Sequence, residues 1–419
     1  MSYYNAEIEI MQADQLRELQ YRRLLKMIDY CIENVPYYKA KLKEAGVNSS
    51  GDIRSLKDIR KLPFTTKEDL KATYPDGLLA VPMDQIVHVH ASSGTTGKPT
   101  IGYYTKNDME VWAEAAARVI MLNGITKDDI LQISVGYGLF TGALGFHQRA
   151  EKIVCTIVPA STGNTQKQLV MMQDVGATAL MATPSFATYL SELIVQSGFP
   201  EEEFKLKKVL LSAERCTAKM RETIEHNLGV VTADNYGLTE CFGPGVAGEC
   251  EHQNGMHISE DIFYPEIIDP ATGEVLPDGE QGELVFTSLC REGMPLLRYH
   301  TRDITVLTHE MCRCGRTSAR IQAPFARTDD MFVFKGVNVF PSYRNGANYQ
   351  HTIVFCLSLN YNVIRKITLI MMEHKNEKGL SQHESAERCT LPVPRYPDGS
   401  QATAISFNCS SLLVKFPQS

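Results

Sequence analysis

A loop of small polar residues between His90 and Gly102 carries the strongest chemical signal in this sequence. It reads HASSGTTGKPTIG. Backbone N–H groups at Gly94 and Gly97 can approach anionic oxygens closely, and Lys98 adds a positive charge. Hydroxyl donors complete the set at Ser92, Ser93, Thr95 and Thr96. The loop therefore predicts a phosphate-binding site, and the alternative is a solvated turn of small polar residues.

Two positions exclude an ordinary nucleotide P-loop. A Walker A loop has a glycine, four further residues and then Gly-Lys-Ser/Thr. Here Ser92 stands at the position of the first glycine, and Pro99 replaces the hydroxyl that would bind Mg²⁺. We therefore expect a different kind of phosphate loop.

A second group of residues has the chemistry of a metal site. Cys250 and His257 lie in ECEHQNGMH, and Cys312 and Cys314 form CRC. Three thiolates and one imidazole complete a tetrahedral zinc site with no position left for water, which is typical of structural zinc. His252 is an alternative imidazole ligand, and four unconnected cytosolic side chains are the alternative to a metal site.

The composition is that of a soluble globular protein with more than one domain. The 419 residues include 42 Lys and Arg and 49 Asp and Glu, a net charge of −7 that argues against nucleic-acid or membrane-surface binding and suits a small-molecule enzyme. The N-terminus has no secretion signal, and no window has the roughly 18 apolar residues of a membrane span. The 11 cysteines are an odd number, which disfavours a disulfide framework. We expect a cytoplasmic protein.

The chemistry-bearing residues have to be positioned by alternating helices and strands. Residues 12–33 have apolar positions at helical spacing, and residues 107–124 and 183–198 are also helical in pattern. Strand-like runs at 152–160 and 207–214 alternate with them, which predicts α/β layers with a mostly parallel sheet. Residues 256–306 have short strands and Gly/Pro turns, typical of an antiparallel β subdomain.

The loop and several later motifs resemble one enzyme superfamily. SSGTTGKPT resembles the phosphate loop of the acyl-adenylate-forming enzymes, and YGLTE, RYHTRD and ARTDDMFVFKG follow in that superfamily's order. ENVPYYKAKLKEAG, LPFTTKEDL, GYGLFTGALGFH, FGPGVAGEC and KGVNVFPS are similar to phenylacetate-CoA ligases. The resemblance runs from the N-terminus to Ser342.

The resemblance implies a fold and a domain organisation. We expect an α/β protein with a large N-terminal AMP-binding domain over residues 1–326, containing parallel sheets and a β subdomain. A small C-terminal α+β domain would occupy residues 327–419 and is atypical after Ser342. Asp329 would be the hinge between them, and Ala326 replaces the glycine that usually begins the hinge motif.

The resemblance also implies a reaction and a role for each motif. Such enzymes join an aryl acid such as phenylacetate to ATP with Mg²⁺, release pyrophosphate, and transfer the acyl group to coenzyme A. Lys98 would clamp the outer phosphates, Thr239 would bond the α-phosphate, and Glu240 would hold Mg²⁺. Tyr236 would stack on adenine, and Asp303 would accept hydrogen bonds from the ribose.

The remaining assignments are implied by the same motifs. The nucleotide-binding set is Ser92, Ser93, Gly94, Thr95, Thr96, Gly97, Lys98, Ala213, Glu214, Asn235, Tyr236, Gly237, Thr239, Asp303 and Arg327. The acid-binding set is Tyr137, Phe140, Gly142, Tyr236, Gly237 and Pro244. Without the family, Asp303 would be a surface carboxylate paired with Arg298 or Arg302, and Tyr137 and Phe140 a tightly packed aromatic pair.

The sequence departs from the family pattern in two places. Arg215 and Cys216 replace a Pro-Trp pair beside adenine, and no Gly-Lys motif occurs after Tyr343, because Lys415 lacks the preceding glycine. Loss of that lysine predicts adenylation slower by roughly a hundred- to a thousandfold. The abrupt change at Ser342 suggests a frameshifted tail.

Two rival functions remain open at this stage. The first is an adenylyltransferase of the same family that acts on a deazaflavin cofactor and needs no coenzyme A. The second is a catalytically impaired nucleotide-binding protein. The partners are small molecules, with no nucleic acid and no membrane, and a homodimer is possible in either case.

Overall fold

The structure is a computed structural model that describes residues 2–92, 99–197, 204–324 and 326–328 with their side chains. Four further strands are described by their backbone: β15 (Phe332–Phe334), β16 (Val337–Val339), β17 (Gln350–Leu357) and β18 (Ile367–His374). The chain divides into two compact units, Met1–Pro341 and Ser342–Ser419. In the second unit, β17 pairs antiparallel with β18.

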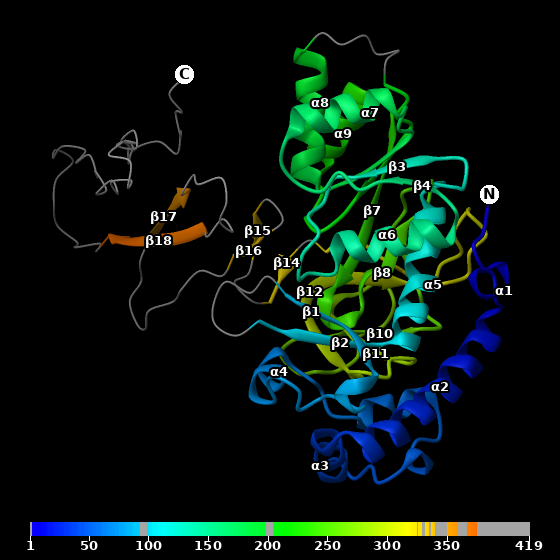
Figure 1. Cartoon of the computed structure of the whole chain (residues 1–419). Helices are drawn as coiled ribbons and strands as arrows, with labels where there is room; N and C mark the ends of the chain where they lie inside the picture. The colour runs from blue at the N-terminus through cyan, green and yellow to red at the C-terminus, as the bar shows by residue number, and fades with distance from the viewer. Residues whose placement is uncertain are drawn as a thin grey trace. The chain divides into compact units, whose positions relative to one another are not determined.

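The N-terminal helices run along one side and one end of the first unit (Figure 1). They are α1 (Ala6–Glu9), α2 (Ala13–Asn34), α3 (Pro36–Glu44) and α4 (Lys67–Ala72). The helix predicted over residues 12–33 is confirmed by α2. Leu24, Ile28 and Cys31 are fully buried along one face of it, as their spacing of three and four residues requires.

Five parallel strands form one half of the main sheet. Their order is β4 (Thr156–Val158), β3 (Ile130–Ile133), β5 (Ala179–Ala182), β6 (Lys208–Leu211) and β7 (Val231–Leu238). Helix α5 (Lys106–Leu122) precedes the first of them in the chain, and the helices between them are α6 (Gly142–Lys152), α7 (Thr165–Asp174), α8 (Pro184–Gln196) and α9 (Ala218–Leu228). The predicted α/β alternation is confirmed, although the strand expected over 152–160 is limited to Thr156–Val158.

The other half of the sheet is antiparallel. It contains β8 (Gly243–Glu249), β9 (Met256–Ile258), β10 (Phe263–Ile268), β11 (Gln281–Ser288), β12 (Tyr299–Thr308), β13 (Arg320–Ile321) and β14 (Ala326–Arg327). The predicted β subdomain is therefore continuous with the parallel strands in one sheet. Helices α5 and α6 pack against β8 (Figure 1).

Strand β7 is where the pairing changes direction. Its first half pairs in parallel with β6, ending at Asp234 opposite Leu211. Its second half pairs antiparallel with β8, beginning at Asn235 opposite Gly248. The residues from Asn235 onward therefore lie at the junction of the two halves.

A separate antiparallel hairpin frames the glycine-rich loop. It consists of β1 (Ile86–Ala91) and β2 (Ile101–Thr105). At the start of the loop, the backbone N–H of Ser92 donates to the carbonyl of Thr100 at 2.9 Å, and the Thr100 N–H donates to Ser92 Oγ at 3.1 Å. The two ends of the loop are thus held together.

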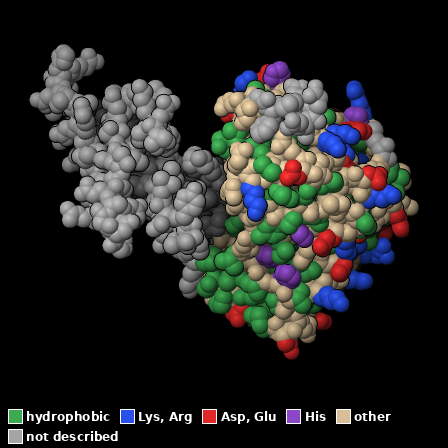
Figure 2. Space-filling model, turned by 45° about the horizontal axis from the view of Figure 1, so that its top comes forward, with side chains coloured by type: hydrophobic (Ala, Val, Ile, Leu, Met, Phe, Trp, Pro, Cys, Tyr) green, Lys and Arg blue, Asp and Glu red, His purple; other side chains and the backbone are tan. Residues whose placement is uncertain are grey.

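The surface carries both signs of charge. On the face drawn in Figure 2, Lys and Arg side chains are interspersed with Asp and Glu. No helix in the part of the chain described here has the length and apolar character needed to cross a membrane.

Candidate active site

The candidate site residues follow the carboxyl ends of neighbouring parallel strands. Residues 134–137 follow β3, residues 212–214 follow β6, and residues 239–240 follow β7. In open α/β sheets, ligands bind beyond the carboxyl ends of such strands. The topology therefore brings the predicted acid-binding and adenine-binding segments to one edge of the sheet.

Asp303 is a buried carboxylate held by two side chains. The hydroxyl of Tyr236 donates to Asp303 Oδ2 at 2.6 Å, and Arg327 Nη1 donates to Asp303 Oδ1. Arg327 Nη2 also donates to the Thr301 carbonyl at 3.2 Å. Burial raises the pKa of Tyr236 well above its usual value, so this hydroxyl is a donor at neutral pH. The structure therefore joins Tyr236, Asp303 and Arg327 into one unit.

The surface-carboxylate interpretation of Asp303 was wrong. Asp303 is 8% exposed. Arg298 forms its ion pair with Glu266 at 2.9 Å, and Arg302 lies 3.6 Å from Glu68. The backbones of these two arginines are strained, because Arg298 has a φ of 44° and Arg302 has a φ of 68°.

The adenine-side segment has an acceptor without a partner. Asn235 Nδ2 donates to the Leu211 carbonyl at 2.7 Å, whereas Asn235 Oδ1 is buried and accepts no hydrogen bond within the described part of the chain. A buried acceptor without a donor is costly. Ala213 lies close in sequence to Leu211, is exposed, and has a φ of 68°. A buried acceptor without a donor and a strained, exposed backbone position are both typical of ligand-binding segments.

Glu214 has a structural partner. Its carboxylate accepts hydrogen bonds from the backbone N–H of Ser185 at 3.1 Å and from Ser185 Oγ at 3.0 Å. Ser185 is in the first turn of α8, where unpaired N–H groups favour a negative charge. The contact of Glu214 with nucleotide stays a prediction.

Thr239 and Glu240 lie in a short 3-10 turn, Thr239–Cys241, that ends β7. Glu240 is buried and Thr239 is half-buried. Gly237, just before the turn, is required by close packing, because a Cβ there would lie 2.1 Å from the carbonyl oxygen of Gly243. The backbone at Gly237 therefore packs directly against the backbone at Gly243, the first residue of β8.

Tyr137 and Phe140 are on the open side of the site. They are 37% and 40% exposed, so the alternative of a tightly packed aromatic pair was wrong. The Tyr137 hydroxyl lies 2.9 Å from His147 Nδ1. Gly142 begins α6 and is half-buried, whereas Pro244 is buried against Gly145. Substrate contacts of all four residues stay predictions.

Some predicted residues lie outside the described part of the chain. They are Ser93, Gly94, Thr95, Thr96, Gly97, Lys98 and Asp329. Their assignments to phosphate binding and to the hinge stay predictions.

The four predicted zinc ligands meet in one cluster. The ligand atoms of Cys250, His257, Cys312 and Cys314 all lie within 4.8 Å of one another, and all four residues are buried. Cys250 Sγ and Cys312 Sγ are 3.7 Å apart, and Cys314 Sγ is 3.3 Å from His257 Nε2. Two thiolates on a tetrahedral zinc ion are separated by about 3.7 Å, whereas a disulfide has an S–S bond of about 2 Å. The donor set therefore fits zinc.

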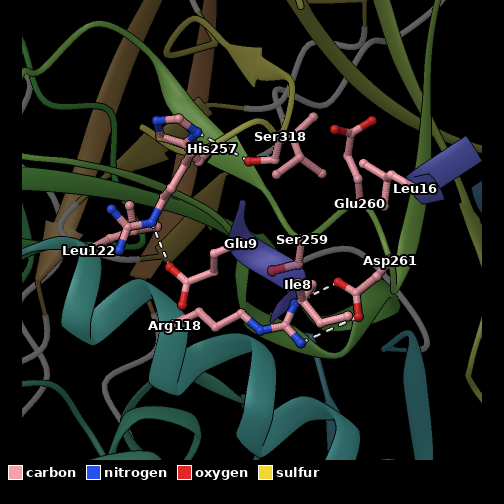
Figure 3. Close-up of a pocket in the computed structure, with 12 residues that line it drawn as sticks. Ile8, Glu9, Leu16, Arg118, Leu122, His257, Ser259, Glu260, Asp261 and Ser318 are labelled. Carbon is pink, nitrogen blue, oxygen red and sulfur yellow. Dashed lines mark hydrogen bonds and ion pairs between the residues drawn. The ribbon is translucent and has the colours of Figure 1, made fainter. Parts of the chain in front are cut away.

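The surroundings of the cluster orient its histidine. His257 Nδ1 lies 3.1 Å from Ser318 Oγ, leaving Nε2 directed at the cysteines. His252 is exposed and is not in the cluster, so the alternative ligand was wrong. A cavity of about 30 Å³ lies beside His257 (Figure 3) and has room for a single water molecule.

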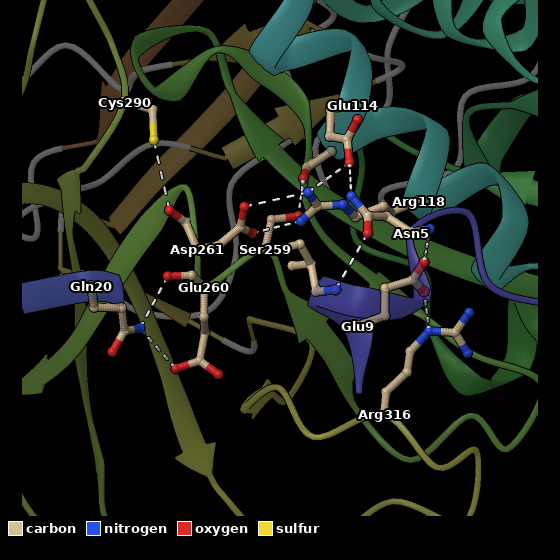
Figure 4. Close-up of polar contacts among 12 residues, drawn as sticks. Asn5, Glu9, Gln20, Glu114, Arg118, Ser259, Glu260, Asp261, Cys290 and Arg316 are labelled. Atoms are coloured by element: carbon tan, nitrogen blue, oxygen red, sulfur yellow. Dashed lines mark hydrogen bonds and ion pairs between the residues drawn. The ribbon is translucent and has the colours of Figure 1, made fainter. Parts of the chain in front are cut away.

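The N-terminal segment is fastened to the loop that carries two of the cysteines. Arg316 Nε donates to Glu9 Oε2 at 2.6 Å, and the Tyr3 hydroxyl donates to the Cys314 carbonyl at 3.1 Å. Beside it, Arg118 forms ion pairs with Asp261 at 2.6 Å and with Glu114 at 2.9 Å (Figure 4). These buried contacts connect α1 and α5 to the strands around the cluster.

Two residues that the sequence motifs did not indicate lie beneath the Thr239–Cys241 turn. Arg291 donates through Nη1 to the Glu240 carbonyl. The Tyr104 hydroxyl lies 3.1 Å from the carbonyl oxygens of Thr239 and of Phe242. Neither residue belongs to a motif with a known spacing, so only the fold brings them to the turn.

Comparisons with known proteins place this geometry in a family. Residues 28–290 match the AMP-binding enzyme family. The phenylacetate-coenzyme A ligase of Thermus thermophilus is 47% identical over 340 residues, which is 81% of this chain and 76% of the relative. The ligase of the same name from Escherichia coli is 46% identical over 337 residues, or 80% of this chain and 76% of the relative.

A solved structure has the same fold. A 2-hydroxyisobutyryl-CoA ligase, in complex with 2-HIB-AMP and CoA, superposes with a TM-score of 0.78 at 29% identity, covering 84% of this chain and 78% of that one. Identity this high over most of the chain, together with motifs gathered at one edge of the sheet, means that the chain belongs to the phenylacetate-CoA ligase family of the acyl-adenylate-forming enzymes.

Proposed function

We propose that this protein is an AMP-forming phenylacetate-CoA ligase. The carboxylate of the acid attacks the α-phosphorus of ATP, the bond to the β-phosphate breaks, and pyrophosphate leaves. The thiolate of coenzyme A then attacks the acyl carbon, and AMP leaves with the proton of the thiol released. The buried unit of Tyr236, Asp303 and Arg327 carries this proposal, because it presents a ring, a carboxylate and a cation side by side.

The unit suits the nucleoside of ATP. A carboxylate has about four lone-pair positions, and Tyr236 and Arg327 each use one of them. The ribose hydroxyls would donate hydrogen bonds to the same carboxylate. Asn235 Oδ1, which is buried and has no donor among the described residues, would accept a hydrogen bond from the amino group of adenine, and the half-buried ring of Tyr236 would stack on the base.

The acid would bind between β7 and α6. Tyr137 and Phe140 offer exposed aromatic surface at the end of β3, which suits a flat aryl group. Gly142, Gly237 and Pro244 would form the rest of the acid-binding site. Thr239 would contact the α-phosphate, and Ser92 to Lys98 would hold the leaving pyrophosphate.

Two metal ions have suitable ligands. Glu240 offers a carboxylate for Mg²⁺, a hard cation that prefers such oxygens and phosphate oxygens. Cys250, His257, Cys312 and Cys314 would hold a structural zinc, which would fix the end of β8 to the loop before β13.

Product analysis tests the proposed function against its rivals. The protein is incubated with ATP, Mg²⁺ and either phenylacetate or a deazaflavin, each with and without coenzyme A. The ligase forms AMP and phenylacetyl-CoA only when coenzyme A is present. Adenylyl transfer to a deazaflavin without coenzyme A, or ATP binding with no product in any mixture, would contradict the proposal. The missing Gly-Lys motif after Tyr343 is the sequence feature behind the second rival, whereas the relatives found favour neither rival.

A further inference from the structure

The turn that carries Glu240 is held from below by two fully buried side chains. Arg291 Nη1 donates to the Glu240 carbonyl. The Tyr104 hydroxyl lies 3.1 Å from the carbonyls of Thr239 and Phe242 and shares its proton between them. Of the four backbone carbonyls from Thr239 to Phe242, three accept hydrogen bonds from these two side chains, at residues 239, 240 and 242.

The turn needs such support because its backbone is strained. Phe242, which follows the turn, has a φ of 68° and a ψ of −35°. A left-handed conformation costs a residue with a Cβ about 1 kcal/mol or more, and it persists only where surrounding contacts impose it. The Phe242 side chain is buried, with 1% of its surface exposed. Its packing and the hydrogen bond from Tyr104 to its carbonyl therefore both hold Phe242 in the strained conformation.

Arg291 and Tyr104 also fix each other. The guanidinium of Arg291 lies 5.0 Å from the centroid of the Tyr104 ring and 5.2 Å from that of Phe242. Tyr104 in turn stacks on Trp112, with ring centroids 5.3 Å apart and an interplanar angle of 27°. The stack therefore runs from the turn into α5.

The backbone next to Arg291 is anchored to the same helix. Asp108, in the first turn of α5, accepts hydrogen bonds from the N–H groups of Glu292 at 2.7 Å and Gly293 at 2.8 Å. The charge of Arg291 is opposed by the buried Asp108 carboxylate, whereas its Nε and Nη2 have no hydrogen-bond partner in the described part of the chain. The hydrogen bond from Nη1 to the Glu240 carbonyl therefore links this buried pair of opposite charges to the turn.

We propose that Arg291 and Tyr104 are positioning residues that hold the Thr239–Phe242 turn so that the Glu240 carboxylate is set for a divalent cation. Within the described residues, this carboxylate has no hydrogen bond or ion pair of its own, so the backbone is what orients it. The inference rests on the proposed function, because it assigns these residues to the magnesium step of that reaction.

The test compares Tyr104→Phe with the control Tyr103→Phe. Both variants lose only a hydroxyl from adjacent buried positions of β2, but the Tyr103 side chain lies on the other face of the strand and, among the described residues, forms no hydrogen bond with the turn. Pyrophosphate release is followed against Mg²⁺ at saturating ATP. Loss of one hydrogen bond predicts that Tyr104→Phe raises the half-saturating Mg²⁺ concentration by about three- to tenfold, whereas Tyr103→Phe leaves it unchanged.

Arg291 is tested with two substitutions and one double variant. Arg291→Met should raise the half-saturating Mg²⁺ concentration more than Tyr104→Phe, and Arg291→Lys should restore part of the loss, because it keeps the charge and one donor. In a Glu240→Gln background, Tyr104→Phe should have no additional effect on the Mg²⁺ dependence. An equal additional effect in both backgrounds, or Mg²⁺ curves like that of Tyr103→Phe, would overturn the proposal.

A binding measurement separates this inference from the proposed function. Trp112 is the one tryptophan of the chain and stacks on Tyr104, so its fluorescence reports on this stack. Titration with Mn²⁺ and ATP should show weaker Mn²⁺ binding in Tyr104→Phe than in Tyr103→Phe. If the wild type releases no pyrophosphate, the proposed function fails, and this titration alone decides the positioning role. Equal Mn²⁺ affinities would then overturn it.

Discussion

Tyr236 and Asp303 are 67 positions apart in the chain and meet in a hydrogen bond of 2.6 Å between the tyrosine hydroxyl and Oδ2. The bond joins β7, at the junction of the two halves of the sheet, to β12. Because Arg327 donates to the other carboxylate oxygen, strand β14 is joined to the same pair. The proposed adenine and ribose contacts are therefore parts of one arrangement.

Asp303→Ala should weaken the use of ATP by about 3 kcal/mol, or roughly a hundredfold in kcat/KM for ATP, because hydrogen bonds to a charged acceptor are lost. Steady-state kinetics with ATP varied would measure this. Asp269→Ala is a suitable control, because Asp269 lies in a surface turn, where it accepts hydrogen bonds from Ala271 and Thr272. An unchanged Michaelis constant and turnover in Asp303→Ala would refute the ribose role.

Zinc should be present at one ion per chain in reduced, dialysed protein. Cys312→Ser should lose the metal and lower the free energy of unfolding by several kcal/mol, on the order of a structural metal's contribution. Elemental analysis and denaturant unfolding would measure both effects. Cys216→Ser is the matched control, since Cys216 is not part of the cluster. Wild-type protein with less than one zinc per chain would end the assignment.

Val154→Gly should stabilise the protein. Val154 follows α6 with a φ of 59° and is 75% exposed, so its branched side chain gains little from packing. The backbone N–H of Cys155 donates to the Ala150 carbonyl there, as in helix ends that favour glycine. Relief of the left-handed strain, less the added chain entropy, predicts a gain of about 1 kcal/mol in the free energy of unfolding. A lower thermal midpoint than that of the wild type would contradict this account.

Asp234→Asn should change how stability depends on pH. Burial, and then the charge of Glu249, raise the pKa of Asp234 to about 7, whereas the unfolded chain has the ordinary value of 3.8. The stability that this raised pKa contributes is fully present below pH 3.8 and is lost as the pH rises through about 7. The neutral amide keeps an acceptor for the N–H of Asn235, which donates to Asp234 Oδ1 at 2.9 Å.

Urea unfolding between pH 5 and 8 measures this effect. The difference in unfolding free energy between Asp234→Asn and the wild type should grow in favour of the variant with rising pH, by roughly 2–4 kcal/mol over the range. Glu222→Gln is the control, because Glu222 is exposed and pairs only with Lys219 at 3.0 Å. Parallel pH curves for Asp234→Asn and the wild type would show that Asp234 is ionised throughout.

Local pattern was sufficient for much of the fold and for the cluster of three cysteines and one histidine. The helix at residues 12–33 follows from spacing alone, and the antiparallel strands after Met256 follow from their turns. The four residues of this cluster could be named because cysteines at short spacing, with a histidine nearby, are typical of a metal site. The choice of His257 over His252 depended on the path of β9, which only the folded chain reveals.

Long-range geometry could not be predicted in the same way. Nothing near Arg291 or Tyr104 in the sequence indicates that both reach carbonyls of the turn at 239–242, because the contact depends on how β2 and the segment after β11 meet at the end of β7. The pairing of Asp303 with Tyr236 and Arg327, instead of with its neighbours Arg298 and Arg302, likewise depends on strand register.

The most direct test of the account is a single-turnover assay of pyrophosphate release with protein in excess over ATP. The mixture contains Mg²⁺ and either phenylacetate, a short-chain acid or no acid, each with and without coenzyme A. We predict release of pyrophosphate with phenylacetate in the absence of coenzyme A, and formation of AMP when coenzyme A is added. Binding of ATP with no pyrophosphate release from any acid would contradict the account.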